Sequence, residues 1–168
     1  MLKIFIRNIW RFIFVILVQV LVLNNIQLFG FVNPYFYVIF ILLLPFETPS
    51  WALLVLAFML GISVDLFVNT PGMHASATVL IAFFRPYVLS IFAPRDNYEV
   101  GTFPRIYYYG FGWFFRYSLI LVVIHHVFLF YLEIFRFSDF FITLSRSLIS
   151  SALTIILIIL SQYVIFRK

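Results

Sequence analysis

The sequence predicts an all-α fold: a polytopic membrane helix bundle with six transmembrane helices, forming a single integral membrane domain over residues 1–168. Of the 168 residues, 65% are hydrophobic and only 10% are charged, whereas about 25% are charged in a typical soluble domain. The mean hydropathy is +1.13. Because one span takes roughly 20 apolar residues, the length accommodates six spans with short loops and leaves no room for a catalytic domain outside the lipid.

Six apolar stretches separated by turn residues define the expected helices. The first is interpreted as a retained helix and not a signal peptide, because no small-residue cleavage site follows its apolar run. The second is short for a span and follows the helix-breaking pair Asn33-Pro34. The longest polar stretch, 93–112, separates the fourth helix from the fifth. The expected helices are 7–28, 35–44, 50–67, 73–92, 113–135 and 144–166.

The basic residues predict the orientation. With six spans, seven of them fall on one side of the membrane, and the other side receives Arg136, with Arg146 near the border. The positive-inside rule then places both termini in the cytoplasm. The basic residues are scattered, so no nucleic-acid partner is expected and the lipid bilayer is the expected surrounding. The seven are Lys3, Arg7, Arg11, Arg95, Arg105, Arg167 and Lys168.

Polar residues around the turn between the third and fourth helices are the first candidate site. Ala57, Gly61 and Asp65 are spaced four apart, so they form one small-residue face that ends in a carboxylate. Asp65 is interpreted as a helix end hydrogen-bonded to the turn, with an ion or substrate ligand as the alternative. His74 follows Gly72 at the start of the fourth helix. An Asp65–His74 pair that ties the turn together is favoured over a catalytic dyad or a metal site, since no nucleophile or third ligand accompanies it.

The second candidate site is Arg85-Pro86 in the fourth helix. Arg85 lies within snorkelling reach of the cytoplasmic headgroups, and Pro86 disturbs the carbonyl of Ala82 and favours a kink. Thr78, Ala82 and Arg85 share a face that is suited to close helix contact. This face is hypothesised to hold a partner helix; snorkelling or structural pairing of Arg85 is the alternative.

The later helices carry polar residues without a recognisable chemical motif. His125-His126 lacks the i, i+4 spacing of zinc helices. His126 and Glu133 share a helix face, which predicts a polar contact inside the bundle. No phosphate-binding loop, nucleophile elbow or dinucleotide fingerprint is present. No enzyme, cofactor or metal site is therefore expected. A hydroxyl stripe interpreted as packing consists of Thr143, Ser147, Ser150 and Thr154.

An ordered set of motifs between Leu44 and Pro94 resembles the MreD family of bacterial rod-shape-determining membrane proteins. The Gly61-x-x-x-Asp65 spacing followed by Gly72 is similar to the family as a whole. Other strings are similar to its subgroup from Bacteroidetes-type bacteria. These strings are Pro45-Phe46-Glu47-Thr48-Pro49, Gly72-Met73-His74-Ala75, Arg85-Pro86 and Pro94-Arg95-Asp96.

The resemblance implies a non-enzymatic membrane scaffold of the cell-wall elongation machinery in the bacterial inner membrane. It implies association with an MreC-like single-span protein, and work alongside RodA, a penicillin-binding transpeptidase and, indirectly, the MreB filament. It further implies a fold similar to the substrate-binding subunits of energy-coupling-factor transporters. The family has no catalytic residues to carry over.

Two other functions remain open from the sequence. A vitamin-binding subunit of an energy-coupling-factor-type transporter would need a cluster of polar side chains in the outer half of the bundle, for which Asp65, His74 and Arg146 are the candidates. A membrane-embedded lipid-modifying enzyme would need convergent acidic or histidine residues at one depth. His125, His126 and Glu133 are its only candidates, and their spacing is poor.

Overall fold

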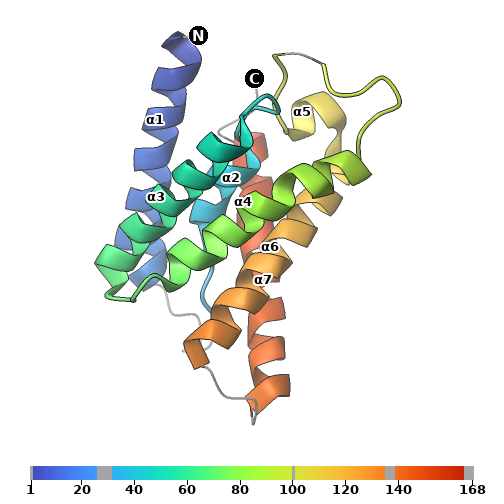
Figure 1. Ribbon diagram of the computed structural model, residues 1–168. Coiled ribbons are helices and arrows are strands. Elements are labelled where there is room, and N and C mark those ends of the chain that lie inside the picture. Colours follow the sequence, from blue (N-terminus) through green and yellow to red (C-terminus); the bar gives the residue numbers. More distant parts are fainter. Residues whose placement is uncertain (1, 26–31, 100, 135–138, 165–168) are drawn as a thin grey trace.

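The computed structural model describes residues 2–25, 32–99, 101–134 and 139–164, and most of these residues are helical (Figure 1). Beyond its α-helical part, the first helix continues as a π-helical turn, Val18–Val22, and a 3-10 turn, Leu23–Asn25. The helices are α1 (Leu2–Leu17), α2 (Ile39–Leu42), α3 (Ser50–Val68), α4 (Met73–Ile91), α5 (Ile106–Tyr109), α6 (Phe111–Ile134) and α7 (Phe140–Val164).

Within the described residues, five helical segments are long and apolar enough to cross a membrane. The chain is therefore a multi-pass helical membrane protein. α3 and α4 begin at the predicted residues, whereas α6 and α7 begin two and four residues before their predicted starts of 113 and 144. The predicted ends at 28, 135 and 166 lie outside the described residues. The five segments are Ile6–Asn25, Ser50–Val68, Met73–Ile91, Phe111–Ile134 and Phe140–Val164.

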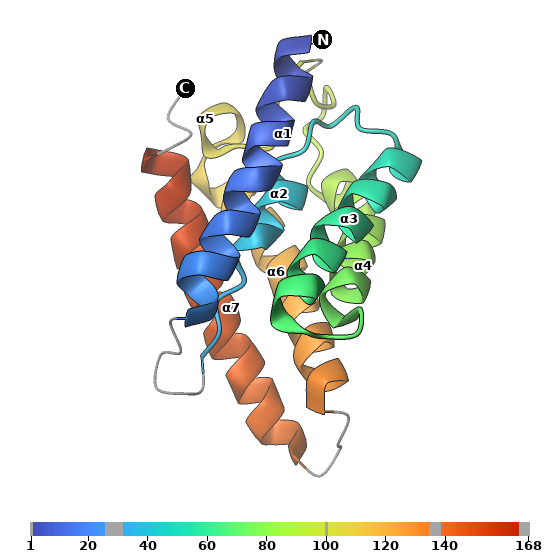
Figure 2. The same cartoon turned by 90° about the vertical axis from the view of Figure 1, so that its left-hand side faces the viewer.

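The long helices surround the short helix α2. In Figures 1 and 2, α3 pairs with α4, α6 pairs with α7, α1 runs along the outside, and α2 lies in the middle of the bundle. The start of α1, the loop before α3, the stretch around α5 and the end of α7 lie at one end of the bundle. The turn between α3 and α4, the end of α6 and the start of α7 lie at the other end. The two ends are called here the terminal end and the turn end.

The second predicted span differs most from the structure. Residues 35–44 contain only a 3-10 turn, Phe36–Val38, and the single helical turn of α2. All ten side chains are buried, and those from Tyr37 to Leu44 are at most 1% exposed. The helix is short because Pro34 and Pro45 flank it, and proline disfavours helix in the residue before it. This largely apolar stretch lies in the core of the bundle and is almost entirely covered by the other helices.

Aromatic side chains close the terminal end. The rings of Phe46 and Tyr98 stack with centroids 4.1 Å apart, and Tyr109 and Trp113 pack against them edge-on. Burial raises the pKa of Tyr98 to about 12, so its hydroxyl stays protonated and donates to the Leu89 carbonyl at 2.7 Å. These contacts attach the loop after α4 to the end of the bundle.

Candidate functional site

The turn between α3 and α4 is organised by the carboxylate of Asp65. Asp65 is 2% exposed, and Oδ1 accepts hydrogen bonds from the Thr70 hydroxyl at 2.5 Å and from the His74 N–H at 3.0 Å. Oδ2 accepts from the Ala75 N–H at 2.9 Å. These N–H groups belong to the first turn of α4, where no helical carbonyl is available to them and negative charge is favoured. Asp65 therefore caps α4 from the end of α3.

Gly61 sets the distance between α3 and α4. A Cβ atom added at Gly61 would overlap the backbone of Ala75 and the hydroxyl of Thr78. The Thr78 hydroxyl donates to the Ala57 carbonyl on α3 at 2.9 Å. Small residues on both helices thus allow backbone-to-backbone contact, as the spacing of Ala57, Gly61 and Asp65 predicts. Gly72 has a φ of 82°, and a Cβ there would meet no atom within 4 Å. Glycine is therefore favoured at this position by the left-handed backbone of the turn and not by lack of space.

Arg85 lies inside the bundle and not at a lipid-facing surface. It is 2% exposed, and its guanidinium donates to the carbonyls of Leu44 at 2.5 Å and Pro45 at 3.4 Å. Its Nε donates to the Tyr117 hydroxyl at 3.0 Å, and that hydroxyl donates to the Leu42 carbonyl at 3.0 Å. Pro86 lies inside α4 as predicted, but the guanidinium pairs with carbonyls that follow α2 and not with those of its own helix.

Arg85 and Tyr117 satisfy the C-terminal end of α2 together with a third side chain. The last carbonyls of a helix have no partner within it, and those of α2 are buried in the bundle. Arg11 from α1 donates to the Leu43 carbonyl at 3.1 Å. The carbonyls of residues 42–45 therefore all accept hydrogen bonds from side chains, as buried backbone at membrane depth requires.

The backbone before α2 is satisfied by side chains from α7 and from the π-helical turn. The N–H of Asn33 donates to the Ser150 hydroxyl at 3.2 Å, and that of Tyr35 donates to the Thr154 hydroxyl at 3.0 Å. The Gln19 amide donates to the Pro34 carbonyl at 3.1 Å and accepts from the Tyr37 N–H at 3.4 Å. The predicted hydroxyl stripe is buried as expected. Two of its members also receive hydrogen bonds from the chain entering α2.

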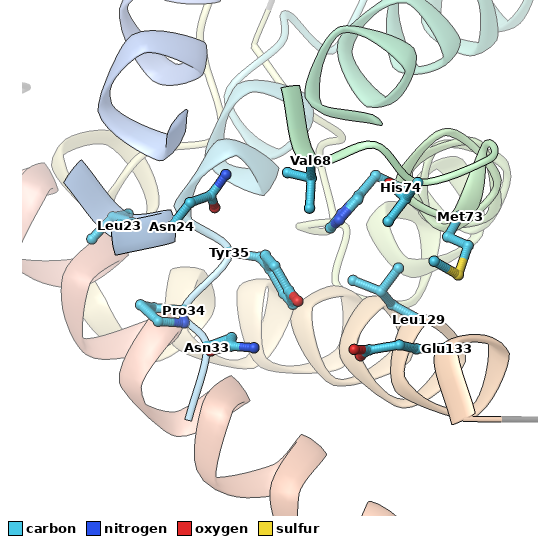
Figure 3. Close-up of a pocket in the computed structure, with 11 residues that line it drawn as sticks. Leu23, Asn24, Asn33, Pro34, Tyr35, Val68, Met73, His74, Leu129 and Glu133 are labelled. Atoms are coloured by element: carbon cyan, nitrogen blue, oxygen red, sulfur yellow. The ribbon is translucent and has the colours of Figure 1, made fainter. Parts of the chain in front are cut away.

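A polar cavity of about 210 Å³ opens at the turn end, between residues 33–35, α4 and α6. The side chains of Asn33, Tyr35, His74 and Glu133 point toward one another across it (Figure 3). Glu133 forms an ion pair with Arg146 on α7 at 3.9 Å. In the orientation that satisfies both of its polar atoms, the Asn33 amide accepts from Arg146 at 3.1 Å. The residues that line the cavity are Leu23, Asn24, Asn33, Pro34, Tyr35, Val68, Thr70, Met73, His74, Leu129 and Glu133.

A chain of hydrogen bonds leads from this cavity into the bundle. The Tyr37 hydroxyl lies 2.8 Å from His74 Nδ1 and 2.8 Å from His125 Nε2. His125 is fully buried, and its Nδ1 has no hydrogen-bond partner among the described residues. The edge of the Tyr35 ring packs against His74 and His125. Tyr37 thereby joins two histidines that are 51 positions apart in the chain.

The structure changes several interpretations of individual residues. The carboxylate of Asp65 binds the backbone of His74, whereas the imidazole binds Tyr37. The predicted contact between His126 and Glu133 is wrong, because His126 pairs with Thr154 and with the Val122 carbonyl. Thr78, Ala82 and Arg85 are all at most 2% exposed, so the chain's own helices cover the face assigned to a partner helix. Among the basic residues used for orientation, Arg136, Arg167 and Lys168 lie outside the described residues.

In the part of the chain that the structure describes, the cavity is lined by hydrogen-bonding side chains without a cluster of metal ligands. Within the described residues, no group of three or more His, Cys, Asp or Glu side chains could hold a metal ion. Tyr35 and Tyr37 were not predicted as site residues, because they lie in a stretch without helical periodicity. The sequence signal that could have indicated them is a pair of tyrosines, separated by one residue, directly after Asn33-Pro34. The cavity thus brings together His74, a candidate for vitamin binding, and Glu133, a candidate for lipid modification.

Comparisons with known proteins do not assign a family. The chain has no significant match among family models, curated proteins or solved structures. The resemblance to the MreD family therefore rests on the sequence motifs alone. Both this resemblance and the similarity to energy-coupling-factor subunits that it implies stay predictions.

Proposed function

We propose that this chain is a non-enzymatic scaffold of the cell-wall elongation machinery in the bacterial inner membrane. In this role it would hold an MreC-like single-span protein and act alongside RodA, a penicillin-binding transpeptidase and, indirectly, the MreB filament. The motifs between Leu44 and Pro94 that resemble the MreD family are the basis of the proposal. We place the partner contact on the lipid-facing surface, because the inner face of α4 is covered within the chain.

The observation that supports this proposal best is that the motif residues are joined to one another. Asp65 caps α4, Gly61 allows α3 and α4 to touch, and Arg85 fixes the start of the Pro45–Pro49 loop. Each of these residues is committed to holding the chain's own shape. A motif of this kind is expected of a protein whose function is to present a fixed surface to partners.

We propose six crossings with both termini in the cytoplasm. Residues 32–44 run from the turn end to the terminal end in Figures 1 and 2. With about 3.3 Å for each of the six non-helical residues and about 1.5–2 Å for each of the seven helical ones, these residues span at most about 30–34 Å, which is close to the thickness of a bilayer core. Arg7, Arg11, Arg95, Arg105 and Arg116 belong to elements at the terminal end, which favours that end as the cytoplasmic one.

Depletion of the chain from its own bacterium tests the role. We expect rod-shaped cells to become round, and we expect a tagged copy in mild detergent to co-purify the MreC-like protein. The Glu99→Gln variant is the matched control, since Glu99 is exposed and lies outside the motifs that carry the resemblance. Normal cell shape after depletion, with membrane levels quantified in the same cells, would contradict the scaffold role.

A second candidate function is a substrate-binding subunit of an energy-coupling-factor-type transporter. The specific observation in its favour is the cavity at the turn end, where Asn33, Tyr35, His74 and Glu133 converge. The two functions differ in the same depletion experiment. Cells that keep their shape but lose uptake of one small nutrient would favour the transporter subunit.

A further inference from the structure

The side of the cavity formed by His74 presents one polar atom without a partner. The side chain of His74 is 4% exposed and lines the cavity. Its Nδ1 is bound to the Tyr37 hydroxyl. None of the residues that the structure describes forms a hydrogen bond with Nε2. Nε2 is not among the buried side-chain atoms that lack a partner, so it is open to the cavity and a ligand atom can reach it.

The hydrogen-bond chain determines whether that nitrogen is a donor or an acceptor. The Tyr37 hydroxyl has one hydrogen, so it donates to one histidine and accepts an N–H from the other. If it donates to His125 Nε2, a neutral His125 carries its hydrogen on Nδ1, which is buried and has no partner among the described residues. Buried N–H groups without an acceptor are rarer than unpaired acceptors. The favoured arrangement is therefore His125 Nε2–H to Tyr37, and Tyr37 O–H to His74 Nδ1.

This arrangement leaves His74 with a hydrogen on Nε2, directed into the cavity. On the opposite side, the Glu133 carboxylate is an acceptor. Arg146 lies 3.9 Å from Glu133 and balances its charge. The two carboxylate oxygens of Asp65 are already bound to Thr70, His74 N and Ala75 N. The Glu133 side chain is 40% exposed and already paired with Arg146, so no unpaired charge among the residues that line the cavity favours a charged ligand.

We propose that the cavity binds a small neutral molecule that accepts a hydrogen bond from His74 Nε2–H and donates one to Glu133. Its volume of about 210 Å³ compares with a cavity of about 150 Å³ that holds benzene. The ligand is accordingly a single ring or a short chain of about ten non-hydrogen atoms that carries an amide or a hydroxyl group. The proposal goes beyond the scaffold role and does not depend on it; it deepens the second candidate function by giving the chemical class of its ligand.

The first test is the tautomer of each histidine, measured by nitrogen NMR on the full-length protein in lipid with ¹⁵N-labelled histidine. The chain has only three histidines. We expect His74 and His125 to carry the hydrogen on Nε2. His126 is an internal reference with the opposite form, because its Nδ1 faces the Val122 carbonyl at 2.9 Å and must donate to it. Hydrogens on Nδ1 of both His74 and His125 would overturn the proposed polarity of the cavity.

The second test uses benzamide as the probe, because its carbonyl can accept from His74 and its amide can donate to Glu133. We expect a saturable shift of the His74 Nε2 resonance. We also expect binding to be weakened about fivefold to tenfold by Glu133→Gln, which replaces a charged acceptor by a neutral one. Leu129→Phe should abolish binding by filling the cavity. Glu99→Gln, at an exposed position of the loop after α4, is the control and should leave binding unchanged.

Two matched compounds separate the proposed ligand class from its rivals. Ethylbenzene has a similar size without polar groups, and benzoate has a similar size with a negative charge. We expect both to bind more weakly than benzamide. No saturable shift with benzamide, or equal or tighter binding of ethylbenzene or benzoate, overturns the proposal. None of these results bears on cell shape or partner recovery, so the scaffold role is judged separately.

Discussion

The α3–α4 hairpin and the segment of residues 32–45 are both buried in the same bundle, but their hydrogen bonds come from different parts of the chain. In the hairpin, Asp65 binds the N–H of Ala75 ten positions away, and Thr78 binds the carbonyl of Ala57 at a separation of 21. In the segment, the partner of the Leu44 carbonyl lies 41 positions away and that of the Tyr35 N–H lies 119 positions away. The hairpin is stabilised locally, whereas the segment depends on four other helices.

This difference follows from the length of the helices. A long helix satisfies its own backbone except at its ends, and in α3 and α4 one pair of ends meets at a short turn. The single turn of α2 satisfies almost none of its backbone, and both of its ends lie within the apolar part of the bundle. Each unpaired group there costs several kcal/mol. Polar side chains such as Gln19 and Arg85 must therefore reach it from elsewhere.

The largest effect is expected when the main donor to the segment is removed. Arg85→Met keeps the length and apolar stem of the side chain but removes the donor of the Leu44 carbonyl and of the Tyr117 hydroxyl. The Pro45 carbonyl, by contrast, keeps the Thr48 hydroxyl at 2.7 Å. We expect a loss of about 3–5 kcal/mol in the free energy of unfolding, because two buried groups each lose a hydrogen bond to a charged donor, which is worth about 1.5–3 kcal/mol. Denaturant unfolding in mixed micelles and the yield of monodisperse protein measure it.

Two further variants make this prediction specific. Arg85→Lys should recover only part of the stability, because one ammonium group cannot reproduce the fork of donors that reaches Tyr117 and the carbonyls together. Arg95→Met removes an exposed arginine of the loop after α4 and should be nearly neutral. If Arg85→Met were as stable as Arg95→Met, the segment would not depend on its distant partners in the proposed way.

The hairpin could be predicted from the sequence because its determinants lie close together in the chain. The spacing of Gly61 and Asp65, the turn residues 69–72 and the start of α4 at Met73 all correspond to features of the structure. Each of these features depends on residues that lie within one or two helical turns of one another in the sequence. Six membrane spans are predicted, and the described residues contain five helices long enough to cross alone. The predicted short span, residues 35–44, forms a 3-10 turn and a single helical turn, so its crossing stays a prediction.

The cavity and the hydrogen-bond chain could not be predicted in the same way. His74, His125 and Glu133 were each noticed as polar residues within apolar stretches, but nothing in their spacing shows that Tyr37 lies between the first two. The partner of Arg85 was missed for the same reason. A polar residue within a span indicates that a partner exists, and the identity of the partner depends on how the helices pack.

An intermediate effect is expected when the close contact in the hairpin is opened. Gly61→Ala adds a methyl group that overlaps the backbone of Ala75, and a helix backbone cannot move aside as a flexible side chain can. We expect a loss of about 2–3 kcal/mol in the free energy of unfolding, within the range for overpacked sites. Gly112→Ala is the matched control, since a Cβ there meets no atom within 4 Å and alanine is the better helix former. Equal stability of the two variants would show that α3 and α4 do not depend on this contact.

The smallest effect is expected for a single hydroxyl group that serves the segment from α7. Thr154→Val keeps the shape of the side chain but removes the acceptor of the Tyr35 N–H at 3.0 Å and the partner of His126 Nε2 at 2.9 Å. We expect a loss of about 1–2 kcal/mol, the usual cost of a buried donor left unpaired. Thr143→Val, on the same helix, is the control, because among the described residues the Thr143 hydroxyl bonds only to the Asp139 carbonyl within its own turn. Hydrogen exchange at the Tyr35 amide sharpens the measurement, since this proton should exchange faster in Thr154→Val than in Thr143→Val. If the two valine variants had the same stability and the same exchange rate at Tyr35, α7 would support the segment by packing alone, and the contrast with the hairpin would rest on Arg85, Arg11 and Gln19.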